Sequence, residues 1–81
     1  MADEKLALVL HLTAGGEPLL FSLETEEAQR LEPKLAQLVK HNAVEPVRTR
    51  DGMTVTVNFA HVAVTYVDDM QRKGTVFGMH R

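Results

Sequence analysis

The sequence predicts a small α+β domain with the element order β-β-α-β-β-β, in which an antiparallel sheet of about five strands carries one helix on one face. Three observations predict this fold class. Stretches in both halves of the chain alternate apolar with other residues, with the period of two that strands show. One middle segment repeats apolar residues every three or four positions, as helices do. The length of 81 residues suits a single domain spanning residues 1–81.

Residues 6–23 are predicted to form a β-hairpin. Residues 6–12 alternate leucine with other residues, and a second alternating run follows Pro18. Proline lacks an N–H and is best tolerated at the first position of a strand. The pair Gly15-Gly16 lies between the two runs, and glycine readily adopts the positive φ angles that hairpin turns need.

The helix is predicted to have Thr25 as its N-cap and to end near Asn42, which can adopt the left-handed conformation. Pro33 interrupts this segment. Either one helix is kinked at Pro33, or a first turn ends at Leu31 and a second helix begins with Pro33 in its first turn. The unbroken apolar stripe favours one kinked helix. The stripe consists of Ala28, Leu31, Leu35, Leu38 and Val39.

Two further strands and a turn follow. Residues 43–50 predict a strand at a sheet edge or with an irregular start, because Pro46 cannot donate to a strand ladder. Residues 53–59 alternate valine with threonine, which indicates a half-buried strand. Residues 62–67 have few polar positions and predict a central strand covered on both faces. One strand over all of this stretch would exceed the usual length of about 5–6 residues, so we expect a turn at 58–61.

The end of the chain is predicted to be mostly irregular. Residues 68–74 are polar and indicate a loop, after which Thr75–Phe77 could add a short last strand. Residues 1–5 and 78–81 are expected to be loose termini.

Composition excludes several classes of protein. The chain has no cysteine, so disulfides, thiolate catalysis and cysteine-ligated zinc are excluded. The same absence is compatible with a cytoplasmic location. No apolar run approaches the roughly 18 residues of a membrane span, and the acidic start is unlike a signal peptide. We therefore expect a soluble domain with no membrane association.

No motif predicts catalysis, a cofactor or a metal site. Ser22 is the single serine and has no glycine elbow around it. The four histidines show no spacing typical of metal ligands. His61 could meet Asp68 or Asp69, although solvated turn and loop residues explain them better. We therefore expect that the protein is not an enzyme and has no cofactor.

Basic residues of the C-terminal half form one candidate nucleic-acid surface. Arg48 and Arg50 share a strand face, and Arg72 and Lys73 lie in the predicted loop. Beside Tyr66 they would form a patch that contacts phosphates and offers an aromatic platform. Nearby acidic residues could neutralise the patch, and the net charge of −2 shows no basic excess. Arg48 and Arg50 could equally guard an edge strand against aggregation.

Apolar strand residues exceed what one helix can cover, and this predicts self-association. The residues expected on the uncovered sheet face are Val9, Leu20, Ala63 and Val67. A second copy would bury them, so a homo-oligomer is predicted, with a dimer favoured. Alternatively, the helix could link two sub-sheets in a partly closed barrel. The sequence thus favours a small non-enzymatic interaction or regulatory module, and the alternative function is a nucleic-acid-binding regulator.

Overall fold

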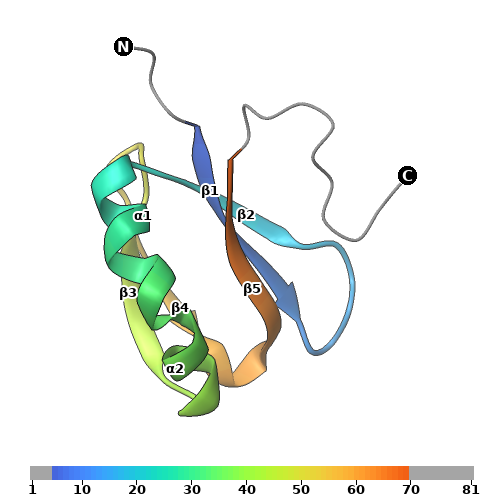
Figure 1. The fold of residues 1–81 in the computed structure, drawn as a ribbon. Helices are drawn as coiled ribbons and strands as arrows, with labels where there is room; N and C mark the ends of the chain where they lie inside the picture. Colours follow the sequence, from blue (N-terminus) through green and yellow to red (C-terminus); the bar gives the residue numbers. More distant parts are fainter. Residues whose placement is uncertain (1–4, 70–81) are drawn as a thin grey trace.

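The computed structural model describes residues 5–69, and the predicted order β-β-α-β-β-β is confirmed (Figure 1). The residues predicted as a last strand, Thr75–Phe77, and as a C-terminal tail, 78–81, lie outside the described residues, as do residues 1–4. The elements are β1 (Leu6–Leu12), β2 (Leu19–Leu23), α1 (Thr25–Leu31), η1 (Glu32–Lys34), α2 (Leu35–Lys40), β3 (Val44–Arg48), β4 (Thr54–Asn58), η2 (Phe59–His61) and β5 (Val62–Asp69).

The five strands of the described chain divide into two antiparallel sheets, where we predicted one. The first sheet has the order β2-β1-β5, and the second pairs β3 with β4. The helical segment leaves the first sheet after β2 and enters the second at β3, so it links two sub-sheets as the barrel alternative requires (Figure 1). The predicted turn after β4 is confirmed as the 3₁₀ turn η2. It redirects the chain so that β5 pairs with β1 instead of β4.

The central strand of the three-stranded sheet is β1, whereas the prediction gave a central place to residues 62–67. Ala7 and Val9 on one face of β1 are each 2% exposed, and Leu8 and Leu10 on the other face are no more than 1% exposed. The core covers the Leu8 and Leu10 face, and side chains of the flanking strands lie beside Val9 on the other face. In the described sheet β5 is an edge strand, and Val64 keeps 47% of its surface exposed. The prediction for residues 62–67 is therefore wrong.

The helical segment is continuous from Thr25 to Lys40, with a tightened 3₁₀ turn around Pro33. Proline lacks an N–H and clashes with the carbonyl four residues earlier, so the segment changes geometry there without ending. The prediction of one kinked helix is thus confirmed in that a single helical segment runs through Pro33, and the change at the proline is a 3₁₀ turn. The N-cap is Glu24 rather than Thr25, and its side chain makes no capping hydrogen bond.

The C-terminus of α2 is closed by a Schellman motif. Asn42 has φ 54°, the predicted left-handed conformation. Its N–H donates to the carbonyl of Val39 (3.2 Å), and the N–H of Ala43 donates to the carbonyl of Leu38 (3.0 Å). These two hydrogen bonds satisfy carbonyls that a helix end otherwise leaves without partners.

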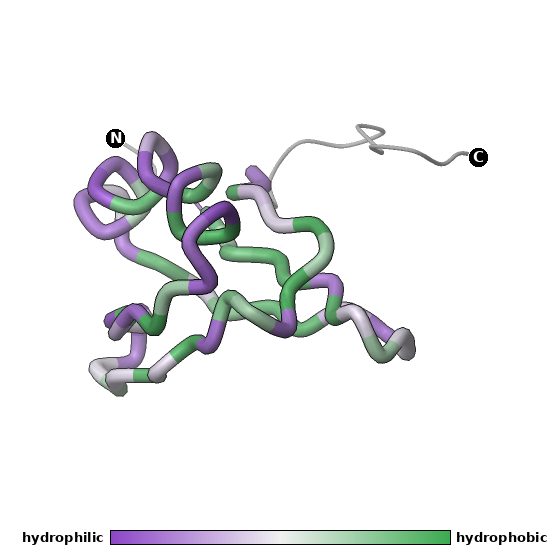
Figure 2. Tube along the Cα trace, turned by 90° about the horizontal axis from the view of Figure 1, so that it is seen from below, coloured by the Kyte–Doolittle hydropathy of each residue, from purple (hydrophilic) through white to green (hydrophobic). Residues whose placement is uncertain are grey.

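The hydrophobic core lies between the helical segment and the inner sides of the two sheets. Figure 2 shows hydrophilic residues along the outer turns of the helical segment and hydrophobic stretches among the strands below it. The periodic leucines of β1 and of the helix meet there, so the predicted stripe is the buried face. The core comprises Leu8, Leu10, Leu23, Ala28, Leu31, Leu35, Leu38, Val47, Val57, Phe59 and Val62.

Candidate functional site

The sheet face turned away from the helix carries apolar or aromatic side chains on all three strands. We call it the outer face and define it by Val9, His11, Leu20, Val64 and Tyr66. Val9 lies opposite Leu20 on one side and opposite Tyr66 on the other, so these side chains form one row across β2, β1 and β5. His11 lies opposite Val64 in the next row. Leu20 and Val64 are 53% and 47% exposed, whereas Val9 between its neighbours is 2% exposed.

A register shift in β5 decides which of its residues belong to the outer face. Pairing slips between His11 and Leu12, so that Val64 and Val62 both have partners on β1 while Ala63 has none. Each extra residue in a strand reverses the faces of the residues beyond it. Of the four residues predicted on the uncovered face, Val9 and Leu20 are found there. Val67 instead packs against the core, and Ala63 is exposed at the shift.

Tyr66 stacks on His11 across β1 and β5. The two ring centroids are 6.0 Å apart and the planes are inclined by 26°. The aromatic pair therefore holds both rings against the outer face, beside Val9 and Val64. Tyr66 was predicted to be an aromatic platform for nucleic acid, and in this arrangement one of its neighbours is a histidine ring.

The residues predicted to form a basic patch are placed on different parts of the fold. Arg48 ends β3, and its backbone N–H donates to Oε2 of Glu27 (2.9 Å). Arg50 lies in the turn before β4, where its N–H donates to the carbonyl of Ser22 (2.7 Å). Tyr66 lies on β5, two strands away from β2. Arg72 and Lys73 lie outside the described residues. The described residues therefore do not bring Arg48, Arg50 and Tyr66 to one surface.

An ionic network on the helix side of β3 was not predicted from the sequence. The Arg30 guanidinium donates to both carboxylate oxygens of Glu27 (3.0 and 2.7 Å) and to Oε2 of Glu45 (2.8 Å). Nζ of Lys34 also donates to Oε2 of Glu45 (3.0 Å). The i,i+3 spacing of Glu27 and Arg30 was the one available signal. The link to Glu45 depends on how β3 packs beside the helix.

The network holds the pKa of both carboxylates low. Hydrogen bonds from Arg30 lower the pKa of Glu27, and a hydrogen bond from the backbone of Arg48 adds to the effect. Hydrogen bonds from Arg30 and then Lys34 lower the pKa of Glu45. The pKa of Arg30 is raised in turn by its bonds to Glu27 and Glu45. The positive charges of Arg30 and Lys34 are therefore neutralised by the carboxylates of Glu27 and Glu45.

His61 and the acidic pair at 68–69 lie at opposite ends of β5. The strand is continuous over Val62–Asp69, and at about 3.3 Å per residue it separates His61 from Asp68 by roughly 20 Å. The possible acid–base or metal site at these residues is therefore not assembled. Among residues 5–69, no three metal-ligating side chains lie close enough to hold an ion.

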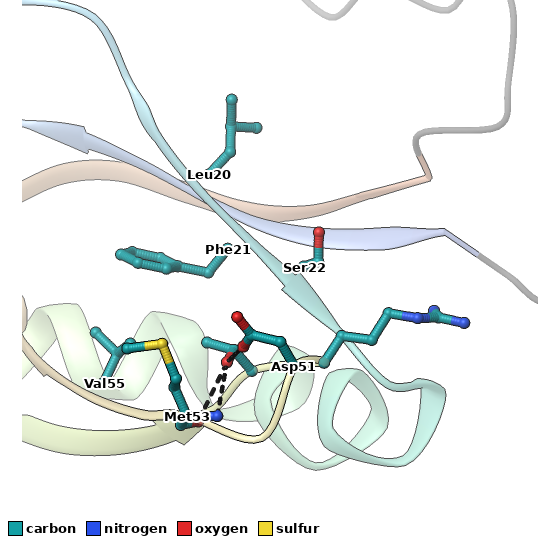
Figure 3. Close-up of a pocket in the computed structure, with 8 residues that line it drawn as sticks. Leu20, Phe21, Ser22, Asp51, Met53 and Val55 are labelled. Carbon is teal, nitrogen blue, oxygen red and sulfur yellow. Dashed lines mark hydrogen bonds between the residues drawn. The ribbon is translucent and has the colours of Figure 1, made fainter.

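A groove separates β4 from the edge of β2 that does not pair with β1. We call it the β2–β4 groove and define it by Leu19, Phe21, Met53, Val55 and Val57. It consists of two hollows of about 420 and 220 Å³, and Phe21 and Val55 line both. Figure 3 shows Phe21, Met53 and Val55 on the groove side, whereas Leu20 points away from them. Leu20 nevertheless lines the larger hollow as well, so the groove and the outer face meet along β2.

A hydrogen-bonded turn closes one end of the groove. The hydroxyl of Thr49 donates to a carboxylate oxygen of Asp51, and the Met53 N–H donates to the same hydroxyl (3.2 Å). Gly52 has φ 91°, which only glycine adopts readily. The Thr49 hydrogen bond lowers the pKa of Asp51, so this exposed carboxylate stays ionised at the groove end. From the same turn, Arg50 donates its N–H to β2.

Within residues 5–69, no helix is both long enough and apolar enough to cross a bilayer. In comparisons with known proteins, no family model, curated protein or solved structure matches the chain.

Proposed function

We propose that this protein is a small non-enzymatic interaction or regulatory module that self-associates through the outer face. One observation carries the proposal: Leu20 and Val64 are about half exposed, in neighbouring rows that also hold Val9, Tyr66 and His11, on the sheet face opposite the core. Removing apolar surface from water contributes about 25 cal/mol per Å². The hydrophobic effect would therefore stabilise a complex in which a partner covers these rows.

A second copy of the chain is the partner that fits this face best. A two-fold axis brings the same rows of both copies together, and two sheets can pack face to face at about 10 Å. Three strands about 4.8 Å apart and five residues long give a footprint on the order of 240 Å². Stable interfaces bury about 800 Å² per partner, so we expect a reversible dimer that depends on concentration.

The cellular setting of this module is also part of the proposal. We place it in the cytoplasm, since a chain without cysteine needs no oxidising compartment for its fold.

No observation among the described residues favours the nucleic-acid function, because Arg48 lies beside Glu27 and apart from Tyr66. Nucleic-acid binding is therefore retained as an outcome of the test below.

The test compares two neighbouring leucines that lie on opposite sides of β2. Leu20 belongs to the outer face and Leu19 lines the β2–β4 groove, and their exposures of 53% and 42% are similar. Sedimentation and light scattering across protein concentrations should show a dimer for the natural chain. Leu20→Glu should give a monomer at every concentration, whereas Leu19→Glu should dimerise like the natural chain.

Two results would contradict self-association through this face. One is a natural chain that is monomeric at all concentrations, and the other is a Leu20→Glu variant that dimerises unchanged. The same measurement with a mixed oligonucleotide at low and moderate salt separates the alternative function. A mass increase with oligonucleotide that disappears at moderate salt would favour nucleic-acid binding.

A further inference from the structure

A third row of side chains borders the outer face. It continues the alternation of the three strands by two residues and consists of Ser22, Ala7 and Asp68. Figure 3 shows Ser22 pointing to the same side of β2 as Leu20. Ala7 is 2% exposed, so the accessible groups of this row are a hydroxyl and a carboxylate.

The outer face therefore lies between an acidic and a basic side chain. Asp68 lies opposite Ala7 and His11 lies opposite Val64, with the row of Val9 between them. Ala7 and His11 are four residues apart on β1, which is about 13 Å. Ion pairs need a separation of about 4 Å or less, so His11 and Asp68 cannot pair within one copy. Among residues 5–69 the carboxylate of Asp68 makes no ion pair.

The row of Val9 is suited to the centre of an interface. Of the three rows, it alone has an apolar or aromatic side chain on every strand, namely Leu20, Val9 and Tyr66. The row of His11 has no member on β2, which begins at Leu19. Two identical copies use the same patch on both sides, so the row that lies on the two-fold axis meets its counterpart. An axis along the row of Val9 therefore buries the most apolar row against itself.

Charge distinguishes the two directions that the two-fold axis can take between aligned sheets. An axis along the strands places His11 over His11 and Asp68 over Asp68 of the second copy, which brings like groups together. An axis across the strands, along the row of Val9, reverses the second sheet. Each end that carries Asp68 then faces the end of the other copy that carries His11. Only the second direction is electrostatically complementary.

We propose that the dimer forms about the axis across the strands, with His11 of each copy paired with Asp68 of the other. This inference rests on the proposed function, because it concerns the dimer of the outer face. Packed sheets lie about 10 Å apart, and side chains from both sheets fill the gap. Ala7 of one copy lies over His11 of the second, and Asp68 is one strand spacing, about 4.8 Å, to the side. An imidazole and a carboxylate that reach into the gap from opposite sheets can therefore meet.

The two pairs would determine how the copies are oriented. The hydrophobic effect is not directional, so the apolar row alone allows both axes. Charged groups at the border of an interface contribute more to its orientation than to its affinity. The dimer is therefore expected to stay weak and reversible, with one preferred orientation.

Charge exchange within one chain tests this orientation. His11→Glu and Asp68→Lys are compared singly and together by sedimentation at pH 6, where histidine side chains are largely protonated. Each single change brings like charges together twice in the dimer and should raise the dissociation constant at least about tenfold. In the double variant the new glutamate of each copy meets the new lysine of the other. Its dissociation constant should return to within about threefold of the natural value.

Two control variants separate local charge from net charge. His41→Glu and Glu26→Lys make comparable changes at the two ends of the helical segment, away from the outer face. Both should dimerise like the natural chain. Circular dichroism checks that every variant is folded.

Cross-linking provides a second measurement that does not depend on charge. Because the sequence contains no cysteine, His11→Cys and Asp68→Cys each introduce a single thiol. A short bismaleimide should join the two variants to each other when they are mixed. Neither variant should be joined to itself, because about 13 Å along the strands separates the two identical positions in the dimer.

The outcomes distinguish this inference from the proposed function. Recovery in the double variant, with cross-linking only in the mixture, supports the orientation. Single variants that dimerise unchanged, a double variant as weak as the single ones, or cross-linking of one variant to itself would overturn the orientation and leave the outer-face dimer standing. A natural chain that is monomeric at every concentration would overturn both.

Discussion

Replacing Arg30 with methionine should destabilise the fold at neutral pH and have a much smaller effect in acid. Methionine keeps an unbranched apolar stem and removes the guanidinium. Four hydrogen bonds are lost: two to Glu27, one to Glu45 and one to the carbonyl of Pro46 (3.1 Å). These bonds tie the middle of the helical segment to β3, so their loss acts on the contact between the helix and the second sheet.

The magnitude follows from the exposure of the partners. The Arg30 side chain is 41% exposed, whereas the side chains of Glu27 and Glu45 are 14% and 15% exposed. Exposed ion pairs contribute about 0.2–1 kcal/mol each, and two pairs in the upper half of this range, at about 0.75 kcal/mol each, give about 1.5 kcal/mol. For a domain of this size the midpoint should fall by roughly 6–12 °C. Lys34→Met removes one pair with Glu45 and should cost about 0.5 kcal/mol.

The pH dependence has a definite sign. Glu27 and Glu45 have lowered pKa values in the folded state, so they bind protons less readily there than in the unfolded chain. Their contribution is present above the unfolded pKa of about 4.3 and is lost as the pH falls through the lower folded values. The difference between the natural chain and Arg30→Met should therefore be largest near pH 7 and should shrink steadily in acid.

Urea denaturation followed by circular dichroism at several pH values measures this difference, at one protein concentration so that self-association does not enter. A cost below about 0.3 kcal/mol at pH 7 would refute the estimate for the pairs. An equal cost at pH 7 and at pH 3 would show that lost packing, and not charge, is responsible.

Three further variants test the fold by urea denaturation. Phe59→Ala should cost about 3–5 kcal/mol, because Phe59 is 1% exposed at the centre of the core; a cost near zero would contradict this packing. Thr65→Val should stabilise by about 1 kcal/mol, because the buried Thr65 hydroxyl has no hydrogen-bond partner among residues 5–69; destabilisation would indicate that the hydroxyl is satisfied. Asn42→Ala should cost about 1 kcal/mol and Asn42→Gly less than about 0.5, because φ is 54°; equal costs would argue against the left-handed helix end.

The sequence by itself determined the elements and most of their ends. Alternation specified β1, β2 and β4, and the three- and four-residue spacing specified the buried stripe of the helical segment. Asn42 marked the end of the helix because few residues tolerate positive φ. These properties depend on interactions within a few residues, so they can be read locally.

The tertiary structure decided which strands pair and which face each residue occupies. Periodicity is the same for a strand at an edge and in the middle of a sheet, so nothing local placed β1 between β2 and β5. The register shift in β5 reversed the expected face of Val67 and brought Val64 and Tyr66 to the outer face. The ionic network around Arg30 and the β2–β4 groove join residues far apart in the chain. Such contacts exist only after the helix and both sheets have packed around the common core, because packing alone sets the distances between these elements.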